Sequence, residues 1–257
     1  MSNLLVSFPN VFPYGLGLGS YDFDTSSFRW IDLAQADRPL LGVAGTCRCG
    51  DNYWALPQLD FGGISGLTRL DLDLHSTGHY PLVQTRDAHS LIADGAGFLV
   101  TDTGANRLNL VRLGEDGQVY EEEFWRACQG DEDLVHLNSV ARLDGDLHVS
   151  VLGPRPEEGW SHAQGGKIIN ITRNEVVCGD LHHPHTLVVH EGALYWLESR
   201  RSRIHRYSRC GGHEVLLELQ GYLRGLTFNE RFMYVGASAL RRRSRSTTGS
   251  RPCYRSR

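Results

Sequence analysis

Four side chains that can bind metals or anions recur at similar intervals along this sequence. His89, Asn138, His185 and Arg224 are separated by 49, 47 and 39 residues, and an apolar stretch follows each of them. Neutral imidazoles are good ligands for zinc, iron, nickel or copper, and the planar guanidinium of arginine holds carboxylates and phosphates. The spacing raises the question of whether the fold brings these four side chains to one place.

Each of the four residues opens the same phrase, which reads as an apolar strand, a turn and a second apolar strand. The phrases are HSLIADGAGFLVTDT, NSVARLDGDLHVSVL, HTLVVHEGALYWLES and RGLTFNERFMYVGAS. The first and third continue into two more predicted strands, which gives a four-stranded unit at the period of a β-propeller blade, roughly 40 to 50 residues. A sandwich of short strands would explain the turns, but not the polar residue at the head of every phrase.

The predicted fold is therefore all-β, a propeller of six blades with an incomplete last blade or, alternatively, of five blades. A weaker copy of the phrase begins at Gly45, and a partial fragment precedes it. We expect the propeller to be a single domain that spans residues 1–240. Residues 241–257 hold seven arginines and no acidic residue, and this Arg/Ser-rich tail is expected to be disordered.

The first strand of each propeller blade lines the central channel, so the heads of the four phrases are expected to converge near one mouth. Strand side chains alternate, so the residue two positions earlier can share that face if the strand extends that far. This second tier reads Asp87, His136, His183 and Tyr222. The predicted ligands of a divalent transition metal, zinc above all, are His89, His136 and His185.

The other channel residues have predicted roles around that metal. Arg224 would anchor an anionic substrate with Asn138 beside it, and Tyr222 or Asp87 would move protons. The over-long connection GPRPEEGWSHAQGGKIINI either brings Trp160 over the mouth to contact the substrate or is a plain insertion. The simpler alternative for the whole set is a water-filled channel whose polar groups have no function.

Composition excludes some classes of partner. Seven of the 26 basic residues lie in 241–257, so the rest of the chain holds 19 basic and 30 acidic residues and is not expected to bind nucleic acid. No run of 18 apolar residues predicts a membrane span, and MSNLLVSFPNVF lacks the features of a signal peptide. A cytoplasmic protein is the expectation.

The phrases DAHSL, HLNSVA, GWSHAQGGKIINI, HPHTLVVHEGALYWLES and GYLRGLTFNERFMYVGAS resemble the motifs of a bacterial conserved family of unknown function. Its members are predicted propellers of the gluconolactonase, strictosidine-synthase and NHL-like superfamily. The resemblance covers about residues 40–240. Beyond the equivalent of Ser238 the family continues through further strands, whereas this sequence departs into the tail, which implies a truncated or altered C-terminus.

The resembled family brings no established activity. Propellers with channel histidines, an arginine and a tyrosine are similar to the peptidylamidoglycolate lyases, whose histidines hold zinc, whereas calcium-dependent lactonases use carboxylate and asparagine ligands. These likenesses imply a metal-assisted lyase or hydrolase that acts on a small anionic molecule, in specialised metabolism. The competing interpretation is a non-catalytic propeller that binds a peptide or a partner protein.

Overall fold

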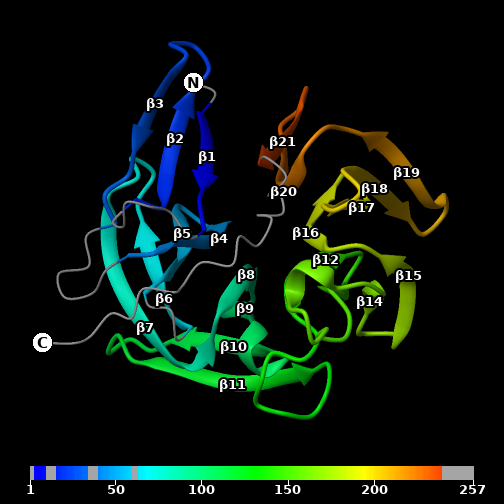
Figure 1. The fold of residues 1–257 in the computed structure, drawn as a ribbon. Helices are drawn as coiled ribbons and strands as arrows, with labels where there is room; N and C mark the ends of the chain where they lie inside the picture. Colours follow the sequence, from blue (N-terminus) through cyan, green and yellow to red (C-terminus); the bar gives the residue numbers. More distant parts are fainter. Residues whose placement is uncertain (1–2, 10–15, 34–39, 60–62, 239–257) are drawn as a thin grey trace, which may run out of the picture.

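The computed structural model describes residues 3–9, 16–33, 40–59 and 63–238, and nearly all of the regular structure there is β-strand. The strands form six antiparallel sheets around a central axis, and the first strand of each sheet lies innermost (Figure 1). The predicted all-β propeller is confirmed. Five of the sheets have three or four strands and form five blades, as the five-bladed alternative predicts. The sixth sheet is the two-stranded β20–β21 hairpin, which stands where the six-bladed prediction has an incomplete last blade.

The blades follow one another in chain order. Blade 1 contains β1 (Asn3–Ser7), β2 (Leu18–Asp22) and β3 (Ser27–Trp30). Blade 2 contains β4 (Gly42–Cys49), β5 (Asn52–Gln58), β6 (Ile64–Leu70) and β7 (Ser76–Arg86). Blade 3 contains β8 (Ala88–Asp94), β9 (Gly97–Asp102), β10 (Arg107–Leu113) and β11 (Val119–Arg126). Blade 4 contains β12 (Leu137–Leu143), β13 (Asp146–Val151), β14 (Gly166–Asn170) and β15 (Glu175–Leu181). Blade 5 contains β16 (Pro184–His190), β17 (Ala193–Glu198), β18 (Arg203–Ser208) and β19 (Gly212–Glu218), and the hairpin contains β20 (Tyr222–Phe228) and β21 (Met233–Ser238).

Two short helices complete the described structure. They are η1 (Thr103–Ala105), directly after β9, and η2 (Trp160–His162), in the long connection between β13 and β14. No helix in the described ranges is long and apolar enough to cross a membrane. The predicted tail, residues 241–257, lies outside the described residues, so its disorder and the domain boundary at residue 240 stay predictions.

Packing between blades explains why the repeated phrases are so apolar. All six residues of β17, ALYWLE, are buried. Because strand side chains alternate, Leu194 and Trp196 pack against blade 4, whereas Tyr195 and Leu197 pack toward the β20–β21 hairpin. Similar apolar clusters lie between blades 1 and 2, 2 and 3, and 3 and 4. The inner strands are thereby held at fixed distances around the channel.

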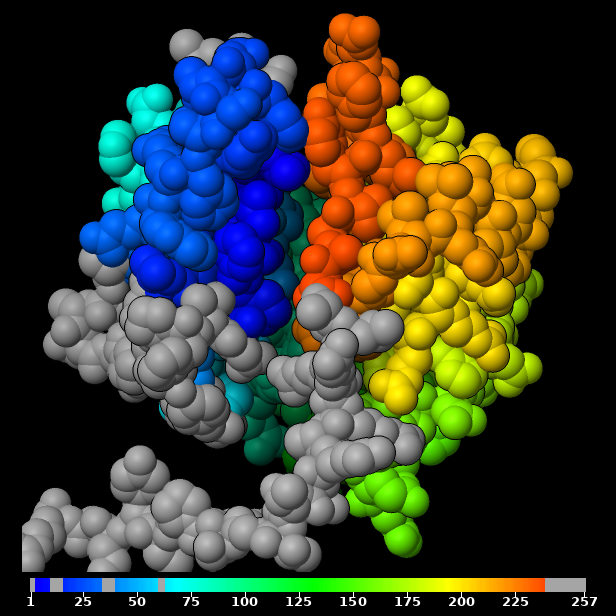
Figure 2. Space-filling model, turned by 45° about the horizontal axis from the view of Figure 1, so that its top comes forward, coloured from blue at the N-terminus to red at the C-terminus, as the bar shows by residue number. Residues whose placement is uncertain are grey.

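The β20–β21 hairpin and blade 1 meet in a different way. Figure 2 shows the two side by side across a furrow, the hairpin in orange and blade 1 in blue. No described strand of one pairs with a strand of the other. An aromatic contact joins them, because the rings of Phe23, after β2, and Tyr234, on β21, have centroids 5.0 Å apart.

Asp146, the first residue of β13, ties blade 4 to blade 5. One of its carboxylate oxygens accepts hydrogen bonds from Asn170 at 2.9 Å, from Arg173 at 2.5 Å and from Arg209 at 2.6 Å. Arg209 lies in the turn between β18 and β19 of the next blade. The hydrogen bonds from Asn170 and Arg173, together with the charge of Arg209, lower the pKa of Asp146 to about 2.

We expect the Asp146 carboxylate to make folding sensitive to acid. An unfolded aspartate has a pKa of about 3.9, so the anion stabilises the fold fully above that pH, and the stabilisation is lost as the pH falls toward the folded pKa. Urea unfolding at about pH 6 and about pH 3 measures the effect. Asp146→Asn should lower the free energy of unfolding more at the higher pH, and an equal loss at both would contradict the assignment.

Candidate functional site

Every described inner strand except β1 carries a β-bulge close to where it begins. The pairing of β12 with β13 skips Asn138, and the pairing of β20 with β21 skips Arg224. In β8 the irregular stretch contains His89, and in β16 it follows His185 directly. A bulge interrupts the ladder and redirects side chains. The heads of the four repeated phrases therefore lie at irregular positions at one end of the inner strands.

The residue just before three of these strands has a left-handed backbone. The φ angles are 51° at Asp87, 49° at His136 and 58° at His183, and the strands begin at the next residue. This conformation is uncommon for residues other than glycine, and such residues gather at functional sites. The inner strand extends to the second tier at Tyr222, the first residue of β20, but not at Asp87, His136 and His183, which a left-handed turn places just ahead of their strands.

One group near this end of the inner strands contains His89, His136 and Trp160. The rings of His89 and His136 meet edge to face with centroids 4.9 Å apart, and the indole of Trp160 lies 4.9 Å from His136. The Nδ1 of His136 donates to the carboxylate of Asp133 at 2.8 Å. The Nδ1 of His89 donates to the carbonyl oxygen of Asp87 at 2.7 Å. The long β13–β14 connection thus folds back onto a channel histidine.

A second group contains His183, His185, Tyr222 and Arg224. The hydroxyl of Tyr222 is 2.8 Å from the Nδ1 of His183, and the ring of Tyr222 lies 5.7 Å from that of His185. The guanidinium carbon of Arg224 is 5.0 Å from the centre of the Tyr222 ring. The Nδ1 of His185 donates to the carbonyl oxygen of His183 at 2.9 Å. Blade 5 and the hairpin therefore build this group together.

Burial lowers the pKa of His89 and of His185 and so favours their neutral form, and the charge of Arg224 acts on His185 in the same direction. Burial and the charges of Arg200 and His136 lower the pKa of His183 to about 4.

Several polar groups near this end of the inner strands have no partner in the described part of the chain. The Nε2 of His183 is buried without a hydrogen bond, and the residue is only 4% exposed. The amide of Asn138 makes no side-chain hydrogen bond to a described residue, although the residue is buried. Arg224 is exposed, and no described carboxylate pairs with it. A buried ring nitrogen without a partner and an uncompensated cation are suited to binding a polar or anionic ligand.

The arrangement does not by itself enclose a metal ion. Within the described ranges, no three side chains of His, Cys, Asp or Glu are placed to hold one together. Of the three predicted ligands, His89 and His136 lie in one group and His185 lies in the other. The three-histidine metal site stays a prediction.

The sequence pattern indicated no role for four residues that form hydrogen bonds within the site. They are Thr103, Asp133, His183 and Ser199. His183 was placed in the second tier but not among the ligands. A signal for the two hydroxyls was present, because Thr103 follows His89 by 14 residues and Ser199 follows His185 by the same interval.

The fold and the site define a class of protein, a β-propeller with two groups of polar and aromatic side chains, histidines among them, near one end of its inner strands. The chain belongs to the family described as "Domain of unknown function (DUF4915)", whose model matches residues 87–252. No curated protein matches the chain in sequence.

Solved structures with the same fold share little sequence with this chain. A structure of streptogramin B lyase is 15% identical with a TM-score of 0.53, covering 89% of this chain and 92% of that one. A chain of a nidogen/laminin complex is 14% identical with a TM-score of 0.63, covering 92% and 86%. Virginiamycin B lyase from Staphylococcus aureus is 13% identical with a TM-score of 0.53, covering 92% and 96%. At these identities the likeness shows the fold alone.

Proposed function

We propose that this protein binds a small anionic molecule at the channel mouth and, with a divalent transition metal held by His89, His136 and His185, cleaves it as a lyase or hydrolase. The observation that carries the proposal is a hydrogen-bond arrangement that the three imidazoles share. Each Nδ1 donates to an oxygen, namely the carbonyl of Asp87, the carboxylate of Asp133 and the carbonyl of His183. Metal-binding histidines are held in this way, which leaves the lone pair on Nε2 for the ion.

The donor set fits a transition metal by its chemistry. Neutral imidazole nitrogens favour zinc, iron, nickel or copper over calcium. The buried, unpartnered Nε2 of His183 lies beside this set and supports a missing ligand there. Because the rings stand in two groups, binding would have to draw the groups together. Such an ion supplies a Lewis acid and lowers the pKa of bound water.

The chain's own residues would bind the substrate and handle its protons. Arg224 offers a planar pair of donors to a carboxylate or phosphate, and the amide of Asn138 can orient a second polar group. Tyr222 shares a hydrogen bond with His183, so this pair can hold or move a proton, and Asp87 can do so beside His89. Trp160 covers His136 and would limit access of water. The two lyase structures with the same fold support the cleavage class by fold analogy only.

Metal content tests this proposal. Untagged wild-type protein would be dialysed against zinc, then against buffer, and measured by plasma mass spectrometry beside His89→Ala, His185→Ala and His75→Ala. His75 is a matched control because its side chain is 74% exposed. We expect about one ion per chain in the wild type and the control, and loss in the other two.

Folded wild-type protein without metal would overturn the metal-assisted mechanism. It would leave the non-catalytic alternative, a propeller that binds a peptide or a partner protein. Equal loss of zinc from His75→Ala would show binding to surface histidines.

A further inference from the structure

We infer that Thr103 and Ser199 are positioning residues of the channel site, each of which fixes the ring proton of one histidine and ties that histidine to the next blade. The inference rests on the proposed function for what the histidines bind. The hydrogen bonds from which it is argued join protein atoms only and do not depend on that function.

The Thr103 hydroxyl links blade 3 to blade 4. It is fully buried, and it donates to the carbonyl oxygen of Leu137 at 2.6 Å. Having given its only proton there, the hydroxyl oxygen has to accept from the Nδ1 of His89, which lies 3.1 Å away. Leu137 directly precedes Asn138, so one hydroxyl connects two residues of the site on neighbouring blades.

The Ser199 hydroxyl repeats this link between blade 5 and the β20–β21 hairpin. It is fully buried and donates to the carbonyl oxygen of Leu223. It therefore accepts from the Nδ1 of His185 at 2.9 Å. Leu223 directly precedes Arg224, so the same relay joins a histidine to the cation of the next element.

The hydrogen bond between this hydroxyl and the head residue is present for the two histidine heads, and none is found for Asn138 or Arg224 among the described residues. In blade 4 the head residue is Asn138, and the residue 14 positions later is Leu152, which has no hydroxyl. After Arg224 the corresponding residue is Ser238, whose hydroxyl donates to the carbonyl of Tyr222 instead of contacting a head residue. We therefore assign the hydroxyl to positioning the imidazole ring.

Two acceptors on one N–H hold the proton on Nδ1 more firmly than one does. With both acceptors in place, the lone pair of His89 and of His185 is on Nε2. Without the hydroxyl, each ring keeps a single backbone acceptor for its Nδ1–H, so the preference for this form over the Nε2–H form becomes smaller. Groups that orient metal-binding histidines in this way typically alter metal affinity about 10- to 100-fold when removed.

The test removes and restores each hydroxyl. Thr103→Val and Ser199→Ala remove it, whereas Thr103→Ser and Ser199→Thr keep it. Ser150→Ala is the matched control, because the buried Ser150 hydroxyl bonds Ser139 and no channel histidine. The readouts are the ring ¹⁵N chemical shifts of His89 and His185 in metal-free protein at neutral pH, and the affinity for zinc.

We expect Nδ1–H rings in the wild type and the control. Ser199→Ala should shift His185 toward the Nε2–H form, Thr103→Val should do the same to His89, and zinc affinity should fall about tenfold or more, with rescue by the hydroxyl-keeping variants. Unchanged ring shifts in both variants, or equal changes in Ser150→Ala, would overturn the inference. If the wild type binds no zinc, the proposed function fails, and the ring shifts still decide the positioning role. The two relays lie on separate blades, so misfolding of one variant leaves the other.

Discussion

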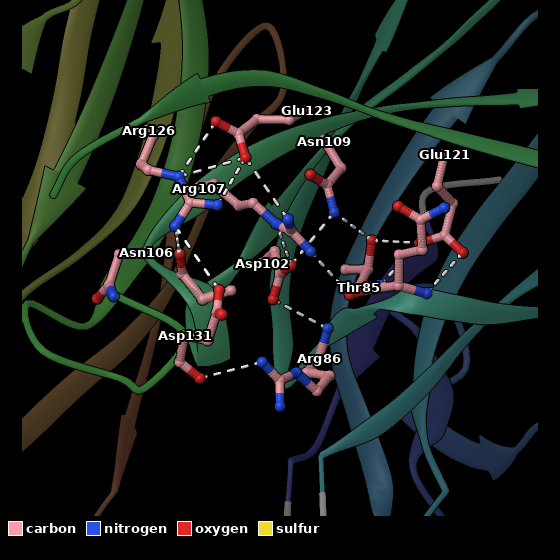
Figure 3. A network of polar contacts seen from close by, with 12 residues as sticks. Thr85, Arg86, Asp102, Asn106, Arg107, Asn109, Glu121, Glu123, Arg126 and Asp131 are labelled. Carbon is pink, nitrogen blue, oxygen red and sulfur yellow. Dashed lines mark hydrogen bonds and ion pairs between the residues drawn. The ribbon is translucent and has the colours of Figure 1, made fainter. Parts of the chain in front are cut away.

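Replacing Asp102 with alanine should lower the free energy of unfolding by about 3–5 kcal/mol. Asp102 is fully buried at the end of β9. Its oxygens accept from the backbone N–H of Arg86 at 3.0 Å, from Arg107 at 2.7 Å and from Asn109 at 3.2 Å (Figure 3). Burial raises the pKa of Asp102 despite these bonds. Its removal leaves the donors of three neighbours without this acceptor in a site that water does not reach.

Urea unfolding with Glu122→Ala as the control measures this effect. Glu122 forms an ion pair with Arg112 at 3.3 Å on the same blade, but both side chains are more than half exposed. Exposed pairs of this kind contribute at most about 1 kcal/mol. Equally small losses in the two variants would show that Glu123, which lies 3.5 Å from Arg107, compensates for the missing carboxylate.

Replacing Arg224 with methionine should weaken the binding of a small anion roughly 10- to 100-fold, because hydrogen bonds to charged groups contribute about 1.5–3 kcal/mol. Arg224 is the exposed cation beside His185 and Tyr222, and no described carboxylate neutralises it. Methionine keeps a long side chain over the Tyr222 ring and removes only the charge and the donors. The fold should therefore be unaffected.

Calorimetric titration with oxalate and with inorganic phosphate, with and without zinc, would measure this change. Arg231→Met is the matched control: Arg231 lies on the same hairpin, exposed, with its guanidinium carbon 5.7 Å from the centre of the Phe232 ring. The control should bind these anions like the wild type. Equal weakening in both variants would assign the effect to the net charge of the hairpin, and no binding by the wild type would contradict an anion site of this class.

The strands of the repeated phrases could be predicted because their local chemistry and their packing agree. In the phrase that begins at Asn138, both central residues of the turn, Asp144 and Gly145, have positive φ, at 49° and 85°. Asp-Gly favours this tight hairpin turn. The flanking strands β12 and β13 are almost wholly buried, as their apolar residues predict. Similar agreement holds along the other phrases, which is why the propeller follows from the sequence.

The details of the site could not be predicted, because they depend on contacts between blades. Asp87, His136 and His183 adopt left-handed backbones without a glycine to signal them. The roles of Thr103 and Ser199 depend on carbonyl oxygens of the next blade, which no local pattern reveals. The sequence predicted that the candidate histidines converge near one mouth, and their division into two groups became visible only in three dimensions.

Because of the bulges in the inner strands, the side chains that would recognise a ligand can differ in type while the blades keep their stability. A residue left out of the strand ladder has no cross-strand partner that restricts its type. At or beside these bulges the chain carries histidine in blades 3 and 5, asparagine in blade 4 and arginine in the hairpin, while the pairing beyond each bulge continues regularly. Such a scaffold can acquire a new specificity one blade at a time, by single substitutions that leave the framework intact.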